Sequence, residues 1–141
     1  MFPSGVGTTY NAANSSVIFL MMRAKTDDTT TTRGREAETL AARHLERGGL
    51  RLVERNFRVR GGEIDLICRD GKILVFVEVR QRSRADYGGA AASITAPKRR
   101  RIVLAARHYL AGKADYDCRF DCVLIEGGQL EWIKNAFAAD D

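Results

Sequence analysis

The chain of 141 residues is long enough for one domain of ordinary size and too short for two independent cores. Its composition, 45% hydrophobic and 29% charged, excludes a fibrous or wholly disordered protein. The longest apolar run, from Val17 to Met22, is far below the roughly 20 residues that cross a bilayer, and no cation precedes it. We therefore expect no membrane span, no export signal and a cytoplasmic location.

The formal net charge of +5 is unevenly distributed along the chain. Residues 33–60 carry eight arginines against four glutamates, and residues 80–108 carry eight basic residues against Asp86 alone. Residues 115–141 have seven acids against Arg119 and Lys134. A polyanionic partner such as nucleic acid would therefore meet the middle of the chain, although basic runs of this kind can also be ordinary solvated surface.

The first third of the chain predicts a tail followed by a helix. Residues 1–32 are rich in Thr, Ser, Asn, Gly and Asp, which is typical of a disordered N-terminal tail. Ala37, Ala41 and Leu45 then recur at helical spacing, and Gly48-Gly49 stops the pattern, so we predict a helix over residues 35–47. Strand-like patterns follow at residues 51–58, 62–69 and 72–80.

The rest of the chain predicts a second helix and two more strands. Thr95-Ala96-Pro97 is typical of a helix start, and Gly112 of a helix end. Strands are expected at residues 119–125 and 130–133, which gives the order αβββαββ within one domain over residues 33–135. Residues 136–141 are expected to form a short C-terminal tail that contributes little. Cys68, Cys118 and Cys122 form no metal-binding or disulfide pattern and are expected to be buried, reduced thiols.

The second and third strands are joined by Asp70-Gly71, the strongest short signal for a hairpin turn. A turn of these two residues would place Glu63 opposite Glu78, and Asp65 opposite Phe76. One face of the hairpin would then be wholly apolar and the other half apolar. The apolar face would hold Ile64, Leu66, Cys68, Ile73, Val75, Val77 and Val79, and the other Glu63, Asp65, Ile67, Leu74, Phe76, Glu78 and Arg80. Both strands should therefore be central strands of a covered sheet.

Three carboxylates, those of Glu63, Asp65 and Glu78, would gather at one end of the second face. Because unpaired buried carboxylates are costly, a positive charge has to compensate them. Arg80 can neutralise one, and a divalent cation such as Mg²⁺ would satisfy two or three through its oxygen ligands. Asp65 and Glu78 would be diagonal neighbours, with Glu38 on the preceding helix as a further ligand. The alternative is a salt-bridge cluster at the surface of the sheet end.

These residues also carry a resemblance to a known family. Glu38, the segment GEIDLI at residues 62–67 and the segment FVEVR at residues 76–80 resemble the motifs of the PD-(D/E)XK nuclease superfamily. Thirteen positions separate Asp65 from Glu78. Within that superfamily the chain, from about residue 34 to residue 133, resembles the YraN family of small bacterial proteins. That family is similar in arrangement to archaeal Holliday junction resolvases.

The resemblance implies a restriction endonuclease-like α/β fold, with a central mixed sheet flanked by helices, and metal-dependent cleavage of DNA. It implies Asp65 and Glu78 as ligands of Mg²⁺ or Mn²⁺, with Glu38 as the helix-borne acid near the metal. The usual lysine two positions after the glutamate is replaced by Arg80. Arginine stays protonated, so it can position water or stabilise phosphate charge but cannot act as a base. We therefore expect slower catalysis.

Four consecutive basic residues, Lys98 to Arg101, lie in the first turns of the second helix, where the helix dipole disfavours cations. A bound DNA phosphate would resolve this conflict. We hypothesise that Lys98, Arg99 and Arg101, with Arg82 and Arg84, contact the DNA backbone; solvated surface charge is the alternative. Because few aromatic residues accompany them, duplex or branched DNA suits the sequence better than single strands.

Three functions remain open at this stage. The first is a Mg²⁺- or Mn²⁺-dependent endonuclease that acts on structured or branched DNA in repair or recombination. The second is a DNA-binding module with the nuclease fold and little catalysis, and the third is a structural or regulatory protein without a DNA partner. The resemblance to resolvases also allows a symmetric homodimer.

Overall fold

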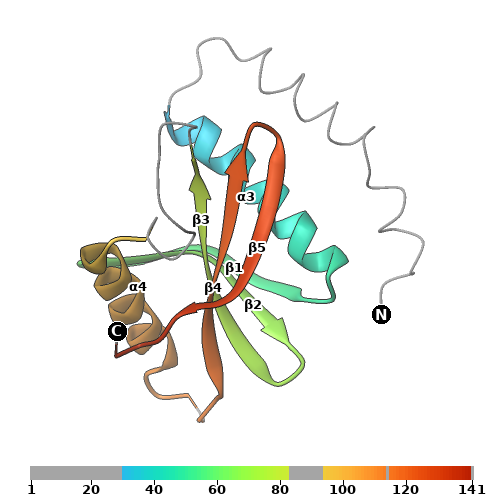
Figure 1. The fold of residues 1–141 in the computed structure, drawn as a ribbon. Coiled ribbons are helices and arrows are strands. Elements are labelled where there is room, and N and C mark those ends of the chain that lie inside the picture. Colours follow the sequence, from blue (N-terminus) through green and yellow to red (C-terminus); the bar gives the residue numbers. More distant parts are fainter. Residues whose placement is uncertain (1–29, 83–93, 114, 141) are drawn as a thin grey trace.

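The computed structural model of the chain describes residues 30–82, 94–113 and 115–140, with the backbone alone at residues 30–33. Within these residues, two helices and five strands follow one another in the predicted αβββαββ order (Figure 1). They are α3 (Thr30–Arg47), β1 (Arg51–Val59), β2 (Gly62–Asp70), β3 (Ile73–Gln81), α4 (Ala96–Leu110), β4 (Cys118–Glu126) and β5 (Gln129–Phe137). Residues 1–29 of the predicted tail lie outside the described residues.

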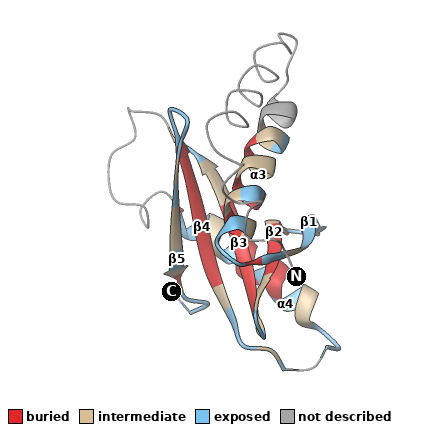
Figure 2. Cartoon of the chain, turned by 90° about the vertical axis from the view of Figure 1, so that its right-hand side faces the viewer, coloured by how far each residue is buried: buried red, intermediate tan, exposed pale blue. Residues whose placement is uncertain are grey.

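All five strands form one mixed sheet in the order β1-β2-β3-β4-β5. The first three strands are antiparallel neighbours, β4 runs parallel to β3, and β5 returns antiparallel to β4. Since a parallel pair needs a crossover, α4 connects β3 to β4. Strands β2 and β3 are therefore internal, as predicted, and Figure 2 shows burial concentrated in β2, β3 and β4.

Helix α3 covers one face of the sheet. Its predicted stripe of Ala37, Ala41 and Leu45 is almost fully buried, and it belongs to one apolar cluster with Val75 and Val77 of β3. The spacing of four residues brings these small and medium side chains to the same side of the helix. Small alanines allow close approach to the sheet, which positions this helix beside the central strands.

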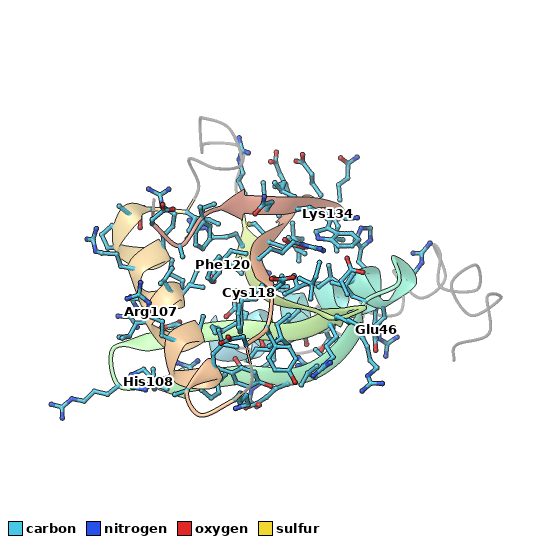
Figure 3. All side chains as sticks on the ribbon, turned by 90° about the horizontal axis from the view of Figure 1, so that it is seen from below. Glu46, Arg107, His108, Cys118, Phe120 and Lys134 are labelled. Atoms are coloured by element: carbon cyan, nitrogen blue, oxygen red, sulfur yellow. The ribbon has the colours of Figure 1, made fainter. Side chains whose placement is uncertain are left out.

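Helix α4 covers the opposite face. Its residues Ile102 and Ala105 join a second cluster with Phe76 of β3 and Phe120 of β4. Figure 3 shows side chains filling the space between α4 and the sheet, with Phe120 among them. Thr95 caps α4, because its hydroxyl accepts a hydrogen bond from the Lys98 amide at 3.3 Å, as the sequence pattern predicted. Neither described helix has an apolar stretch long enough to span a membrane.

The predicted register of the β2–β3 hairpin is wrong by two residues. Asp70 pairs with Ile73 and Leu66 with Val77, so the turn consists of Gly71 and Lys72 instead of Asp70 and Gly71. Gly71 has a φ of 61°, whereas Lys72 is not among the residues of positive φ. This is the pattern of a type II′ turn, which requires glycine only at its first central position. A shift of two residues does not by itself move a side chain to the other face, because side chains alternate along a strand with a period of two.

The first half of β2 departs from strict alternation. Ile64, which the sequence placed with Leu66, instead belongs to the cluster under α4, together with Ile67. The β2–β3 pairing ends at Leu66, so the segment before it is free to turn toward α4. A Cβ atom on Gly62 would lie 2.6 Å from the carbonyl oxygen of Arg101, which shows how closely this segment approaches the helix.

Two element boundaries and one cysteine also differ from expectation. Helix α3 begins at Thr30, five residues before the predicted start. Strand β5 continues to Phe137, where a tail of little consequence was expected. Phe137 is 6% exposed and stacks on Phe120 with ring centroids 4.8 Å apart. The end of β5 therefore completes the core under α4. Cys68 and Cys122 are buried as predicted, but Cys118 is exposed.

Candidate functional site

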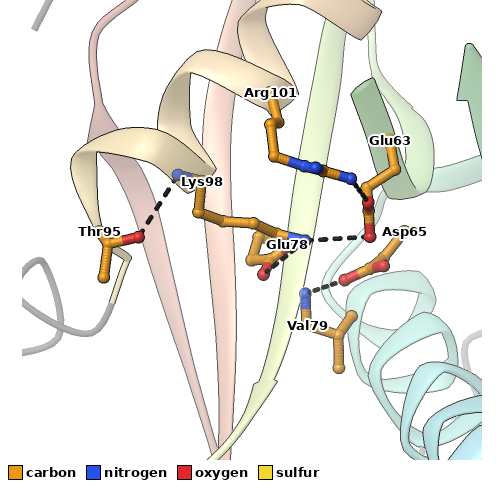
Figure 4. A network of polar contacts seen from close by, with 7 residues as sticks. All are labelled: Glu63, Asp65, Glu78, Val79, Thr95, Lys98 and Arg101. Atoms are coloured by element: carbon orange, nitrogen blue, oxygen red, sulfur yellow. Dashed lines mark hydrogen bonds and ion pairs between the residues drawn. The ribbon is translucent and has the colours of Figure 1, made fainter. Parts of the chain in front are cut away.

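Asp65 and Glu78 lie on neighbouring central strands, at the point where the β2–β3 ladder ends. Leu66 and Val77 are the last paired residues, and the same register places Asp65 opposite Glu78, directly across instead of diagonally. The Asp65 carboxylate accepts a hydrogen bond from the Val79 amide at 2.8 Å. A side chain therefore takes the place of the next ladder bond, and this holds the two carboxyl groups side by side (Figure 4).

Glu78 is the most strongly perturbed acid of this site. Its side chain is 4% exposed, and burial, followed by the charge of Asp65, raises its pKa to about 8. Lys98 lowers this pKa, and Arg80 does so to a smaller extent. The Glu78 Oε1 atom is buried and has no hydrogen-bond partner. A buried carboxylate in this state either holds a proton or requires a further cation.

Glu63, the third carboxylate expected here, turns to helix α4. Its two oxygens pair with Lys98 Nζ at 3.1 Å and with the Arg101 guanidinium (Figure 4). These partners, Arg101 first, hold the pKa of Glu63 below its usual value against the effect of burial. The salt-bridge alternative therefore describes Glu63. Within the described residues Glu78 has Lys98 alone at ion-pair distance, 3.7 Å away, and Asp65 accepts a hydrogen bond from the Val79 amide. The two acids therefore remain together with less compensation than Glu63 has.

Glu38 approaches the pair from α3. Burial and the charge of Asp65 raise its pKa, and Asn56 and Arg55 of β1 oppose this rise. Its Oε1 atom accepts a hydrogen bond from Asn56 Nδ2 at 2.9 Å and lies 3.9 Å from the Arg55 guanidinium. Glu38 is thus close enough to interact with Asp65 electrostatically, but its nearest polar partner is Asn56.

Asn56 was not predicted as a site residue. It has a φ of 53°, and the β1–β2 register places it opposite Asp65. Asparagine tolerates this left-handed conformation better than most residues and is depleted in strands. An asparagine inside an otherwise strand-like segment was therefore the available signal. Its side-chain amide donates the hydrogen bond that holds Oε1 of Glu38.

A divalent cation fits this arrangement through two protein ligands instead of three. Among the described residues, no group of three His, Cys, Asp or Glu side chains is arranged to hold a metal. Asp65 and Glu78 nevertheless present adjacent carboxylates, one with an unpartnered buried oxygen. Mg²⁺ is often bound by one or two carboxylates while water and substrate phosphate complete its coordination. The donor set therefore suits Mg²⁺ or Mn²⁺.

The predicted basic residues differ in their contacts. Lys98 and Arg101 contact Glu63, whereas the Arg99 guanidinium donates to the Ile94 carbonyl oxygen at 2.9 Å. Arg82 lies 3.7 Å from Glu126. Arg80 has no hydrogen bond or ion pair within the described part of the chain, and Arg84 lies outside it. The strands and the start of α4 thus bring Lys98, Arg101 and the two central carboxylates to one place.

Comparison with known proteins gives a family without an assigned activity. The model of the uncharacterised protein family UPF0102 matches residues 37–125. A UPF0102 protein of Dechloromonas aromatica is 82% identical over 120 residues, which cover 85% of this chain and all of that protein. Relatives of the same description include one from Cupriavidus taiwanensis, 60% identical over 77% of this chain and 84% of its own length. Another, from Nitrosomonas europaea, is 55% identical over 74% of this chain and 92% of its own length.

Proposed function

The chain belongs to the uncharacterised protein family UPF0102, and from the geometry of its site we propose that it is a metal-dependent DNA endonuclease. In this proposal it is a YraN-type member of the PD-(D/E)XK superfamily, and it cleaves structured or branched DNA during repair or recombination. The αβββαββ order and the internal position of both acid-bearing strands support the assignment. The family description itself names no substrate.

One observation carries the proposal. Asp65 and Glu78 come from adjacent central strands with their carboxyl groups together, and the buried Glu78 Oε1 has no partner. A purely structural pair of this kind would be unfavourable, because like charges and burial both oppose ionisation. A site that receives a divalent cation during the reaction explains why the two acids are kept together.

The roles of the residues follow from their positions. Asp65 and Glu78 would hold Mg²⁺ or Mn²⁺, and Glu38, oriented by Asn56, would stand beside them. Such an ion neutralises charge on a phosphodiester and lowers the pKa of bound water. Arg80 adds positive charge near the carboxylates without a partner in the described part of the chain. The basic residues 98–101 at the start of α4 would meet the DNA backbone from the same side.

A cleavage assay tests this proposal. Purified protein is incubated with duplex, flap and four-way DNA, with Mn²⁺ or with EDTA, and compared with Asp65→Ala. We expect cleavage that requires the metal and falls at least 100-fold in the variant, because one of two metal ligands is gone. Glu131→Ala, which removes an exposed carboxylate on β5, is the matched control and should cleave like the wild type.

A DNA-binding module with little catalysis is the second candidate, and Arg80 at the usual lysine position is the observation that favours it. In that case the wild type binds branched DNA but leaves it intact in Mn²⁺, and Asp65→Ala binds equally well. The absence of both binding and cleavage would contradict both proposals. Sedimentation of the protein with a four-way junction would show whether two subunits bind one junction.

A further inference from the structure

Within the described residues Lys98 is the basic residue in contact with both Glu63 and Glu78, although it lies 20 positions after Glu78 in the sequence. Its Nζ atom is 3.1 Å from Glu63 Oε2 and 3.7 Å from Glu78 Oε2, and its side chain is 22% exposed. Within the described residues it is the one cation at ion-pair distance from Glu78. Arg80, two residues after Glu78 on the same strand, makes no such contact there.

The start of α4 holds Lys98 in this position. Thr95 caps the helix through the Lys98 amide, and the lysine side chain then extends along the sheet to the carboxylates (Figure 4). A cation in the first turn of a helix is disfavoured by the helix dipole. A lysine that served only as solvated surface charge would therefore be more favourable elsewhere on the helix. Glu63 also has Arg101 as a partner, so Lys98 is not needed to neutralise the charge of Glu63.

From these contacts we infer that Lys98, supplied by α4, is the catalytic cation of the site and donates hydrogen bonds to the phosphate under attack. This inference rests on the proposed nuclease function and replaces the role in gripping the DNA backbone that the sequence suggested for Lys98. The ammonium group carries three donors on a flexible stem, and it already lies beside the oxygen of a proposed metal ligand. A phosphate oxygen bound beside Asp65 and Glu78 would therefore lie within reach of the Lys98 ammonium group.

The test compares Lys98→Gln with Arg80→Gln under single-turnover conditions, with four-way DNA, Mn²⁺ and the protein in excess. We expect Lys98→Gln to lower the cleavage rate at saturation at least 100-fold, and Arg80→Gln to lower it at most tenfold. The affinity of Lys98→Gln for DNA, measured by fluorescence anisotropy in Ca²⁺, should stay within threefold of the wild type. Lys72→Gln, at the exposed turn of the same hairpin, is the matched lysine control.

Three results would overturn the inference. The first is a loss in Arg80→Gln equal to or greater than that in Lys98→Gln. The second is weaker DNA binding by Lys98→Gln with a smaller salt dependence and an unchanged rate at saturation, which would return Lys98 to a role in gripping the DNA backbone. The third is a lower melting temperature of Lys98→Gln without any kinetic change, which would make the lysine structural.

A second measurement decides the inference if the wild type cleaves no DNA and the proposed function fails. Calorimetry would follow the Mn²⁺-dependent binding of a 5′-phosphorylated dinucleotide, a small probe of phosphate binding at the site. We expect this binding to weaken about tenfold in Lys98→Gln and less than threefold in Arg80→Gln. Equal effects, or no Mn²⁺-dependent binding by the wild type, would overturn the inference.

Discussion

At the scale of single residues, the site combines one satisfied acid with one unsatisfied acid. Glu63 has two cationic partners, which lower its pKa, whereas Glu78 is buried beside Asp65 and its pKa is raised to about 8. Both acids are within ion-pair distance of the same lysine, so the difference in their pKa comes from the Arg101 contact at Glu63 and from burial and the Asp65 charge at Glu78. The electrostatic cost of ionisation is therefore greatest at Glu78, and a bound cation would lower it.

The raised pKa of Glu78 predicts how the stability of the metal-free protein depends on pH. Between its ordinary value of 4.5 and about 8, the folded state holds this proton more tightly than the unfolded state. The free energy of unfolding should therefore fall as the pH rises through this interval and level off above it. Glu78→Gln removes this titration, so its denaturation midpoint in EDTA should fall less between pH 5.5 and pH 8.5.

At pH 8.5 we expect the free energy of unfolding of Glu78→Gln to exceed that of the wild type by on the order of a few kcal/mol. Glu38, whose pKa is also raised, contributes a slope of the same sign to both proteins and cancels in the comparison. Glu131→Gln should follow the wild-type curve. Parallel curves for Glu78→Gln and the wild type would show that Glu78 ionises in the folded protein as it does in the unfolded chain.

At the scale of elements, the close approach of β2 to α4 decides where the basic residues lie. Gly62 packs against the helix backbone, and Arg101 and Lys98 thereby reach Glu63, the next residue of β2. A β-strand can approach a helix this closely only where it has no side chain. This contact connects the fold to the site, because it sets the distance between the α4 cations and the carboxylates.

Gly62→Ala tests this contact. The added Cβ atom would lie 2.6 Å from the Arg101 carbonyl oxygen and 3.0 Å from the Ala105 amide nitrogen, so strand and helix must separate. We expect a loss of about 1–3 kcal/mol in unfolding free energy, measured by urea denaturation. Gly34→Ala in α3 meets no atom within 4 Å and should cause no loss. Equal midpoints for Gly62→Ala and the wild type would contradict the packing described.

At the scale of the whole molecule, one sheet separates two apolar clusters, and each is closed by one helix. The cluster under α4 also contains Phe57 and Tyr109 at its border, whose rings lie 5.2 Å apart at nearly a right angle. Strand β5 completes this cluster from the other end of the chain through Phe137. The face of the sheet under α4 is thus packed by residues from all five strands and from α4, whereas α3 packs on the other face.

Phe137→Ala should therefore destabilise the whole domain. Phe137 is buried and stacked on Phe120, and removal of a buried aromatic ring costs about 3–5 kcal/mol. Thermal unfolding followed by circular dichroism would measure the loss as one cooperative transition. Truncation after Ala139, which removes only Asp140 and Asp141, is the control and should leave the midpoint unchanged. A small effect of Phe137→Ala would mean that β5 ends before this residue.

The sequence alone determined the order of the elements, the internal position of the hairpin and the faces of most of its side chains. These depend on local periodicity and turn residues, so Asp65 and Glu78 were placed at one end of a shared face although the register was wrong by two. Contacts between distant segments were decided only by the tertiary structure. The pairing of Glu63 with α4, the orientation of Glu38 by Asn56 and the approach of Lys98 to Glu78 depend on how helices dock against the sheet. Periodicity within a helix or strand specifies which side is buried, but not the distance or angle at which another element meets it.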